Sequence, residues 1–194
     1  MRKRTFAIVL VAMSAVLNMV GSNLALFLKL PVYLDTLGTM VAGALLGPWY
    51  AICAGVVSGI LTGITTDIYS LFFLPVQCVI GFLSGWVFRE RRKGKKLPVL
   101  ASVPIISVPG TFVAAVISAA VFGGVTSSGS TVLVQVFHHL GVHLTVSVFL
   151  VQFITDFFDK LIVFWAAMMV AKVVQKNFPQ IMTEEKGGGR HGAL

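Results

Sequence analysis

Long apolar stretches separated by short basic clusters constrain the fold of this chain more than any other feature. Hydrophobic residues make up 57% of its 194 residues and charged residues only 11%. A helix of about 20 apolar residues crosses the hydrocarbon core of a bilayer. Six apolar stretches run approximately over residues 6–28, 35–46, 50–66, 69–88, 97–122 and 144–174. We therefore predict an all-α integral membrane protein, folded as a bundle of six transmembrane helices.

The distribution of positive charge predicts the orientation of this bundle. The net charge is +8, and the basic residues lie at positions 2–4, between Arg89 and Lys96, and near the end of the chain, with Lys29 and Lys160 as the exceptions. Cytoplasmic segments of membrane proteins carry such an excess of lysine and arginine. We therefore expect both termini in the cytoplasm. Anionic lipid headgroups are the expected partners of these clusters, and nucleic acid is not.

The composition changes near the C-terminus. Glu184, Glu185 and three consecutive glycines at 187–189 follow the last apolar stretch. Polar and glycine-rich segments bury too little apolar surface to fold. We expect residues 1–176 to form a single six-helix membrane domain and residues 177–194 a disordered cytoplasmic tail.

The region from Leu30 to Tyr50 contains the most unusual expected element. Asp35 to Leu46 is too short for a comfortable bilayer crossing, and Pro31 precedes it in a predicted bend. Irregular backbone at membrane depth is tolerated where protein buries it or where it lines a cavity. The sequence therefore predicts a short second helix and a re-entrant-like first outer loop that lines a ligand pocket.

The last apolar stretch carries polar residues on one helical face. Gln152, Asp156 and Lys160 are spaced four residues apart, so Asp156 and Lys160 can form an ion pair. Charged side chains at this depth are costly and should face the interior of the bundle. They either form a structural ion pair or make the floor of a polar pocket. Asn18 and Gln77 need buried partners for the same reason.

Signatures of enzymes and metal sites are absent from the sequence. It contains no HExxH or GxSxG motif, and the glycine-rich segment 124–131 has Ser130 where a phosphate-binding loop has lysine. His139 and His143 lie one helical turn apart, but no cysteine or carboxylate stands nearby to complete a metal site. We expect no enzymatic activity, no cofactor and no bound metal, and a contact of one histidine with a ligand.

Three segments carry a resemblance to a known family. They are Asn18–Gly21, Pro31–Thr39 (Pro-Val-Tyr-Leu-Asp-Thr-Leu-Gly-Thr) and Ala44–Trp49 (Ala-Leu-Leu-Gly-Pro-Trp). With the six short spans, they resemble the substrate-binding S components of energy-coupling factor (ECF) vitamin transporters. The resemblance covers about residues 5–175 and is most specific between Leu30 and Tyr50.

The resemblance implies a multi-pass protein of a prokaryotic plasma membrane that binds a vitamin or related small heterocyclic compound with high affinity. It also implies a transmembrane scaffold subunit and two cytoplasmic ATPase subunits as partners, with ATP hydrolysed by the latter. Cobalamin-like, pyridoxine-like, riboflavin-like and pantothenate-like ligands all remain open. The chain begins Met-Arg-Lys rather than Met-His-His, which disfavours the cobalt and nickel branch of the family.

Mapped onto this chain, the resemblance places the binding pocket in the first loop and in the outer parts of later helices. The expected substrate-binding residues are Tyr33, Asp35, Thr36, Asp67, Tyr69, Gln77, His139, Gln152 and Asp156. The family docks its first helix on the scaffold through an alanine-xxx-alanine pattern. Here Ala7, Val11 and Ala15 form the corresponding row, with valine in the middle.

A self-sufficient proton-coupled permease is the alternative from a different functional class. In that case Asp156, Asp159 and Lys160 would relay protons. A short chain without a clear pair of matching half-repeats is less typical of secondary transporters. The two hypotheses differ in whether the isolated protein drives uptake.

Overall fold

The computed structural model describes residues 2–95, 97–123 and 126–177. Within these residues the chain forms eight α-helices and no strand. The helices are α1 (Arg2–Phe27), α2 (Leu37–Leu46), α3 (Pro48–Thr65), α4 (Tyr69–Phe72), α5 (Leu74–Arg92), α6 (Val99–Phe122), α7 (Ser130–His139) and α8 (Leu144–Asn177). The predicted all-helical fold is confirmed. The tail expected to be disordered lies almost wholly outside the described residues.

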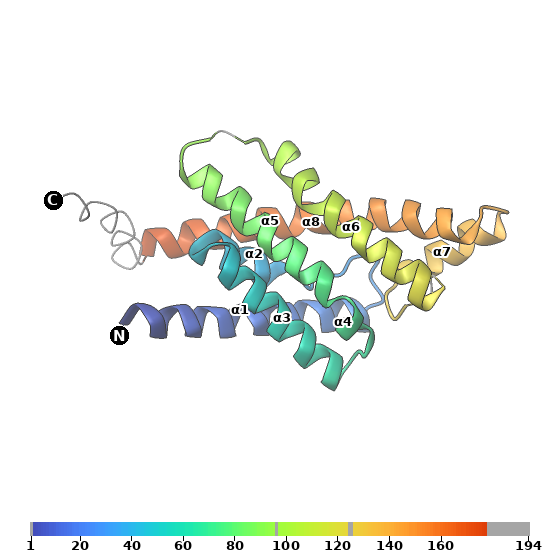
Figure 1. Ribbon diagram of the computed structural model, residues 1–194, viewed down its shortest axis with the longest axis horizontal. Coiled ribbons are helices and arrows are strands. Elements are labelled where there is room, and N and C mark those ends of the chain that lie inside the picture. Colours follow the sequence, from blue (N-terminus) through green and yellow to red (C-terminus); the bar gives the residue numbers. More distant parts are fainter. Residues whose placement is uncertain (1, 96, 124–125, 178–194) are drawn as a thin grey trace.

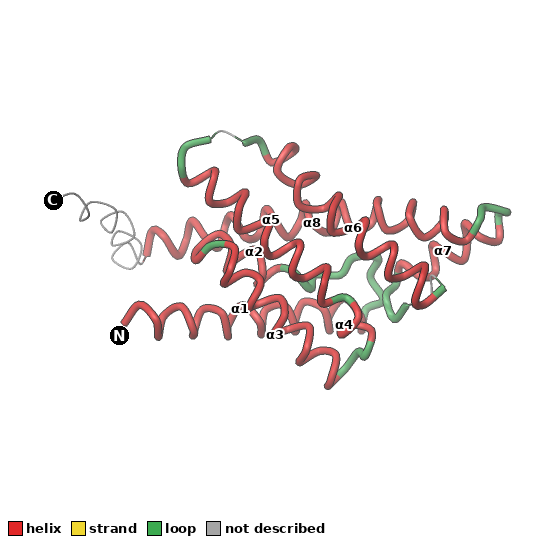
Figure 2. Tube along the Cα trace, in the orientation of Figure 1, coloured by secondary structure: helices red, strands yellow, loops and turns green. Residues whose placement is uncertain are grey.

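The long helices run roughly along one axis of an elongated bundle (Figure 1). The start of α1 and the end of α8 lie at the same end of it, whereas α7 and the first turns of α8 project at the opposite end. Two irregular segments, residues 28–36 and 126–129, run between the helices on the side toward α7 (Figure 2). At the end toward α7, the bundle therefore has irregular chain segments between its helices.

Three helices of the described chain are long and apolar enough to cross a membrane. They cover Arg4–Phe27, Pro48–Thr65 and Val99–Phe122. Helices α5 and α8 have 19 and 34 residues, but each carries several charged residues. These helices indicate a membrane protein. The count of six spans and the side on which the termini lie stay predictions.

The expected short second helix is present as α2, which has 10 residues. Gly47 ends it with a φ of 98°, a conformation that favours glycine, and Pro48 then occupies the first turn of α3. At the other end, Gly38 lies so close to the backbone of Ser14 in α1 that a Cβ would collide with it. Close packing of this kind lets such a short helix sit inside the bundle.

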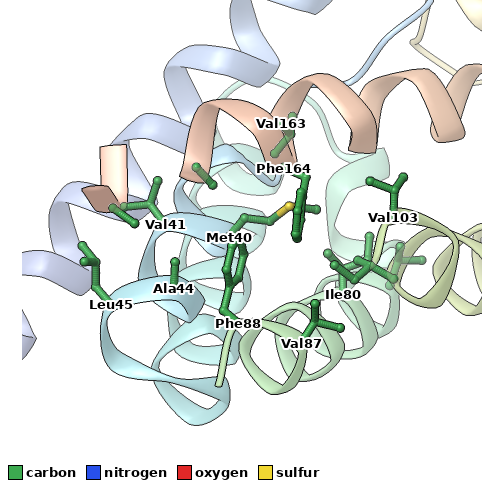
Figure 3. Close-up of a cluster of buried hydrophobic side chains, with 14 residues drawn as sticks. Met40, Val41, Ala44, Leu45, Ile80, Val87, Phe88, Val103, Val163 and Phe164 are labelled. Atoms are coloured by element: carbon green, nitrogen blue, oxygen red, sulfur yellow. The ribbon is translucent and has the colours of Figure 1, made fainter. Parts of the chain in front are cut away.

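The largest apolar core joins α2, α5, α6 and α8 (Figure 3). Met40 of α2, Val87 of α5 and Val163 of α8 are completely buried. The rings of Phe88 and Phe164 stack with their centroids 4.7 Å apart. This core holds together the helices that, farther along their length, position a polar pocket.

Candidate functional site

A pocket opens where the first loop meets α3, α5 and α8. Its lining also includes side chains of α1, α4 and the segment 126–128. Seven residues expected from the sequence to bind substrate line it: Tyr33, Asp35, Asp67, Tyr69, Gln77, Gln152 and Asp156. These positions are far apart in the sequence, and the fold brings them to one cavity.

The first loop is held in the bundle by a carboxylate of α8. The Asp159 Oδ1 atom accepts hydrogen bonds from the backbone N–H groups of Tyr33, at 3.0 Å, and Leu34, at 2.8 Å. Leu34 has a positive φ of 52°, which is uncommon for a residue other than glycine. The carboxylate thus accepts hydrogen bonds from backbone N–H groups that have no helical partner and that lipid could not bond. The loop is thereby anchored at the floor of the pocket.

One ammonium group lies among three carboxylates at this floor. The Lys160 Nζ atom lies 2.6 Å from an oxygen of Asp159, 3.0 Å from Asp156 and 3.9 Å from Asp35. Lys160 is only 2% exposed. The predicted pair of Asp156 and Lys160 is present, and Thr111 of α6 also donates a hydrogen bond to Asp156. One cation and three carboxylates thus share a space largely shielded from solvent, so the carboxylates outnumber their counter-charge.

A chain of side-chain hydrogen bonds connects α1 to the first loop. Asn18 Nδ2 donates to Thr39 Oγ1 at 2.7 Å and to Ser58 Oγ at 3.0 Å. Thr39 Oγ1 donates to Gln77 Oε1 at 3.4 Å, and Gln77 Nε2 donates to Asp35 Oδ2 at 2.7 Å. The network fixes the orientation of Asp35 from four helices and explains why Asn18 and Gln77 are tolerated in apolar helices.

The α6–α7 segment contributes the upper wall of the pocket. Ser127 Oγ donates a 2.7 Å hydrogen bond to Asp67, and the hydroxyl groups of Tyr33 and Ser130 lie 3.1 Å apart. A Cβ atom at Gly129 would collide with the carbonyl groups of Lys29 and Leu30. The segment therefore packs directly on the first loop and links it to α7.

Two expected substrate-binding residues do not line the pocket. Thr36 precedes α2 and is fully buried. His139 ends α7 and is exposed, as are His138 and His143. The three histidines thus point away from the pocket, while α7 packs on α8 through Val134. Helix α7 ends too early to include His143.

The expected docking row of α1 lies mostly inside the bundle. Ala7 is 6% exposed and Ala15 is 2% exposed, whereas Val11 is half-buried. The neighbouring Ile8, Met13 and Val16 point outward. A partner approaching α1 in this conformation would meet this outward face first.

Several pocket residues were not included in the sequence-based set. Asn18 lines the pocket, but the sequence indicates it only as an amide that needs a partner and as part of a segment resembling the family. Asp159 lies directly behind the lining, and the sequence indicates it only for the proton relay of the permease alternative. Their isolation as polar residues within apolar helices was the available signal. The serines at 127 and 128 gave no signal, because a loop of glycine, serine and threonine looks alike whether or not it covers a site.

Comparison with known proteins identifies the kind of chain that carries this pocket. A family model described as "ECF transporter, substrate-specific component" matches residues 5–177. Neither a curated protein nor a solved structure gives a significant match.

Proposed function

Since the chain belongs to the family of ECF transporter substrate-specific components, we propose that it binds a vitamin or related small heterocyclic compound in the pocket beneath its first loop. The substrate contacts are proposed to come from Tyr33, Asp35, Gln77, Gln152 and Asp156, with Asp67 and Tyr69 at the mouth. The aromatic rings provide flat surfaces for a heterocycle, and the amides and carboxylates provide directional hydrogen bonds.

The observation that carries this proposal is the convergence of polar side chains on one cavity. Asp35 comes from the first loop, Gln77 from α5, and Gln152 and Asp156 from α8, and all four line the same pocket. Apolar neighbours such as Phe73 and Ile80 surround them. A largely apolar cavity with a few converging polar groups is typical of a small-molecule site.

The energy for uptake is proposed to come from partner subunits. In this proposal the chain assembles with a transmembrane scaffold subunit within a prokaryotic plasma membrane. Two ATPase subunits join the complex on the cytoplasmic side. The outward face of α1 beside Val11 is the proposed contact, because Ala7 and Ala15 are covered. Copurification from the native host tests this assembly, and a chain that copurifies with no ATPase would contradict it.

Native mass spectrometry of the protein purified from its own host in mild detergent tests the binding function. We expect one small-molecule adduct of vitamin size per chain. The variant Gln77→Leu, which removes the amide that orients Asp35, should lose the adduct while the folded protein is retained. Retention of the adduct by this variant would move the site away from the pocket.

The buried group of Asp156, Asp159 and Lys160 also suits a proton relay, so the permease alternative needs its own test. Purified protein in liposomes should bind substrate without accumulating it when a pH gradient is applied. Accumulation by the isolated chain would favour the permease.

A further inference from the structure

The pocket has an excess of negative charge. Among its described lining residues, Asp35, Asp67 and Asp156 are acidic, and Lys160 is the single basic residue. Asp159 lies directly behind this lining, completely buried. Buried charges are costly unless they are paired, so the pocket as it stands requires another positive group.

Lys160 does not provide this additional positive charge, because it is already paired with other carboxylates. Its ammonium group lies within 3.0 Å of both Asp156 and Asp159. Asp159 is further occupied by the backbone of the first loop. Lys160 thus pairs with the carboxylates of Asp156 and Asp159 at the floor of the pocket, while Asp35 stands 3.9 Å away and has no comparably close cation within the described chain.

Two buried side-chain atoms of the pocket that lack a hydrogen-bond partner in the described chain are acceptors. Gln152 is 7% exposed, and its Nε2 atom donates to Ser118 at 2.6 Å. Its Oε1 atom has no hydrogen-bond partner in the part of the chain that the structure describes, and the same holds for Asp35 Oδ1. Buried acceptors without a donor cost free energy, and a ligand that donates hydrogen bonds would remove this cost.

We propose that the pocket selects a substrate that is positively charged and rich in N–H donors, such as a protonated amine or amidine on a small nitrogen heterocycle. This inference rests on the proposed function and narrows its substrate class. The cationic nitrogen donates to Asp35 Oδ1, within the negative field of Asp156, and a second N–H group donates to Gln152 Oε1. Tyr33 and Phe73, which also line the pocket, flank the ring. Compounds that carry a carboxylate or phosphate are rejected, because like charges repel strongly in a shielded pocket.

The test compares ligands that differ in one substituent, which sets their charge. One series on a pyridine ring is pyridoxamine, pyridoxine and pyridoxic acid, which carry an ammonium, a hydroxyl and a carboxylate group at the same position. The second series is the aminomethyl, hydroxymethyl and carboxyl derivatives of one methylated aminopyrimidine. Binding to the full-length protein in nanodiscs is measured by calorimetry. In each series that binds, the ammonium compound should bind at least about tenfold more tightly than the hydroxyl compound, as a charge-assisted hydrogen bond provides.

Variants locate the source of the preference. Asp35→Asn keeps the shape of the side chain in a loop and should reduce the ratio of ammonium to hydroxyl affinity about tenfold. Asp156→Asn should act similarly, but Asp156 also bonds to Lys160 and Thr111, so its folding is checked by size-exclusion chromatography. The matched control is Glu90→Gln, which removes a carboxylate that pairs with Lys93 and Lys95 away from the pocket. It should leave the ratio unchanged.

Identification of the host-derived adduct by tandem mass spectrometry separates the two levels of the argument. A compound that is cationic at neutral pH supports both the proposed function and the substrate class. An anionic or N–H-free compound, or equal affinity across a series, overturns the inference and leaves the substrate-binding function intact. A protein with no adduct that binds no compound of either series overturns both.

Discussion

Helices α5 and α8 are apolar over one part of their length and polar over another, and both parts are buried. Toward the end of α5 and beyond the middle of α8, Phe88 and Phe164 stack in a core of aliphatic side chains (Figure 3). Nearer the start of the same helices, Gln77 of α5 and Asp156 of α8 line the pocket. The two regions share a backbone and differ in what holds them together.

The comparison shows that the polar region carries the stricter geometric requirement. In the apolar core, side chains of suitable shape gain dispersion contacts without a specific partner atom. In the pocket, each amide and carboxylate needs a partner at hydrogen-bonding distance, because lipid and the interior provide none. Polar atoms without a hydrogen-bond partner in such a region therefore indicate a ligand, whereas small gaps in the apolar core would not.

The largest effect is expected when the cation of the polar region is removed. Lys160→Met leaves Asp156 and Asp159 buried without a counter-charge and should lower the free energy of unfolding by about 4 kcal/mol. Unfolding by SDS in mixed micelles, followed by circular dichroism, measures the loss. Lys172→Met, at an exposed position of the same helix, should change it little. Equal stability of the two variants would contradict a stabilising role of the Lys160 ion pairs.

A truncation in the apolar core should have the next largest effect. Phe164 is completely buried, and Phe164→Ala should cost about 3 kcal/mol because it leaves a cavity beside Phe88. The same SDS titration measures it. Phe158, which is 55% exposed on the same helix, provides the control variant Phe158→Ala, which should lose far less. Similar losses for both would mean that this core is not packed as described.

An intermediate effect is expected from the amide in α1. Asn18→Ala removes two donated and two accepted hydrogen bonds and should destabilise the protein by about 2 kcal/mol. Asn23 donates only to a carbonyl of its own helix, so Asn23→Ala should cost less. Thermal unfolding monitored by intrinsic fluorescence compares them. A larger loss of stability in Asn23→Ala than in Asn18→Ala would show that the Asn18 network does not stabilise the protein.

The smallest effect should come from the contact between the first loop and α7. Tyr33→Phe removes a hydroxyl that lies 3.1 Å from Ser130 and should cost about 1 kcal/mol or less. Hydrogen exchange should nevertheless become faster in residues 126–130, which this contact holds on the loop. Tyr50→Phe, at a tyrosine 43% exposed in α3, should leave this segment unchanged. Unaltered exchange in Tyr33→Phe would show that the packing of Gly129 and the hydrogen bond from Ser127 to Asp67 hold the segment without this hydroxyl.

Much of this organisation was predictable from the sequence. The short second helix followed from the few residues between Asp35 and Leu46, and the pairing of Asp156 with Lys160 followed from helical spacing. Helical spacing could not decide whether Ala7 and Ala15 face inward, because a row of small residues suits a neighbouring helix of the same chain as well as a partner. His139 was misleading for a related reason, since its face could cover a pocket or point outward.

The sequence by itself determined that the chain is helical, belongs in a membrane and must bury a few polar groups, because these properties depend on local composition and periodicity. Only the tertiary structure decided which partner each group has. Asp159 meets the backbone of Tyr33 across 126 positions of sequence. The packed structure also leaves Gln152 Oε1 without a donor in the described chain. Hydrogen bonds depend on distance and direction between atoms, and such long-range geometry exists only once the helices have packed.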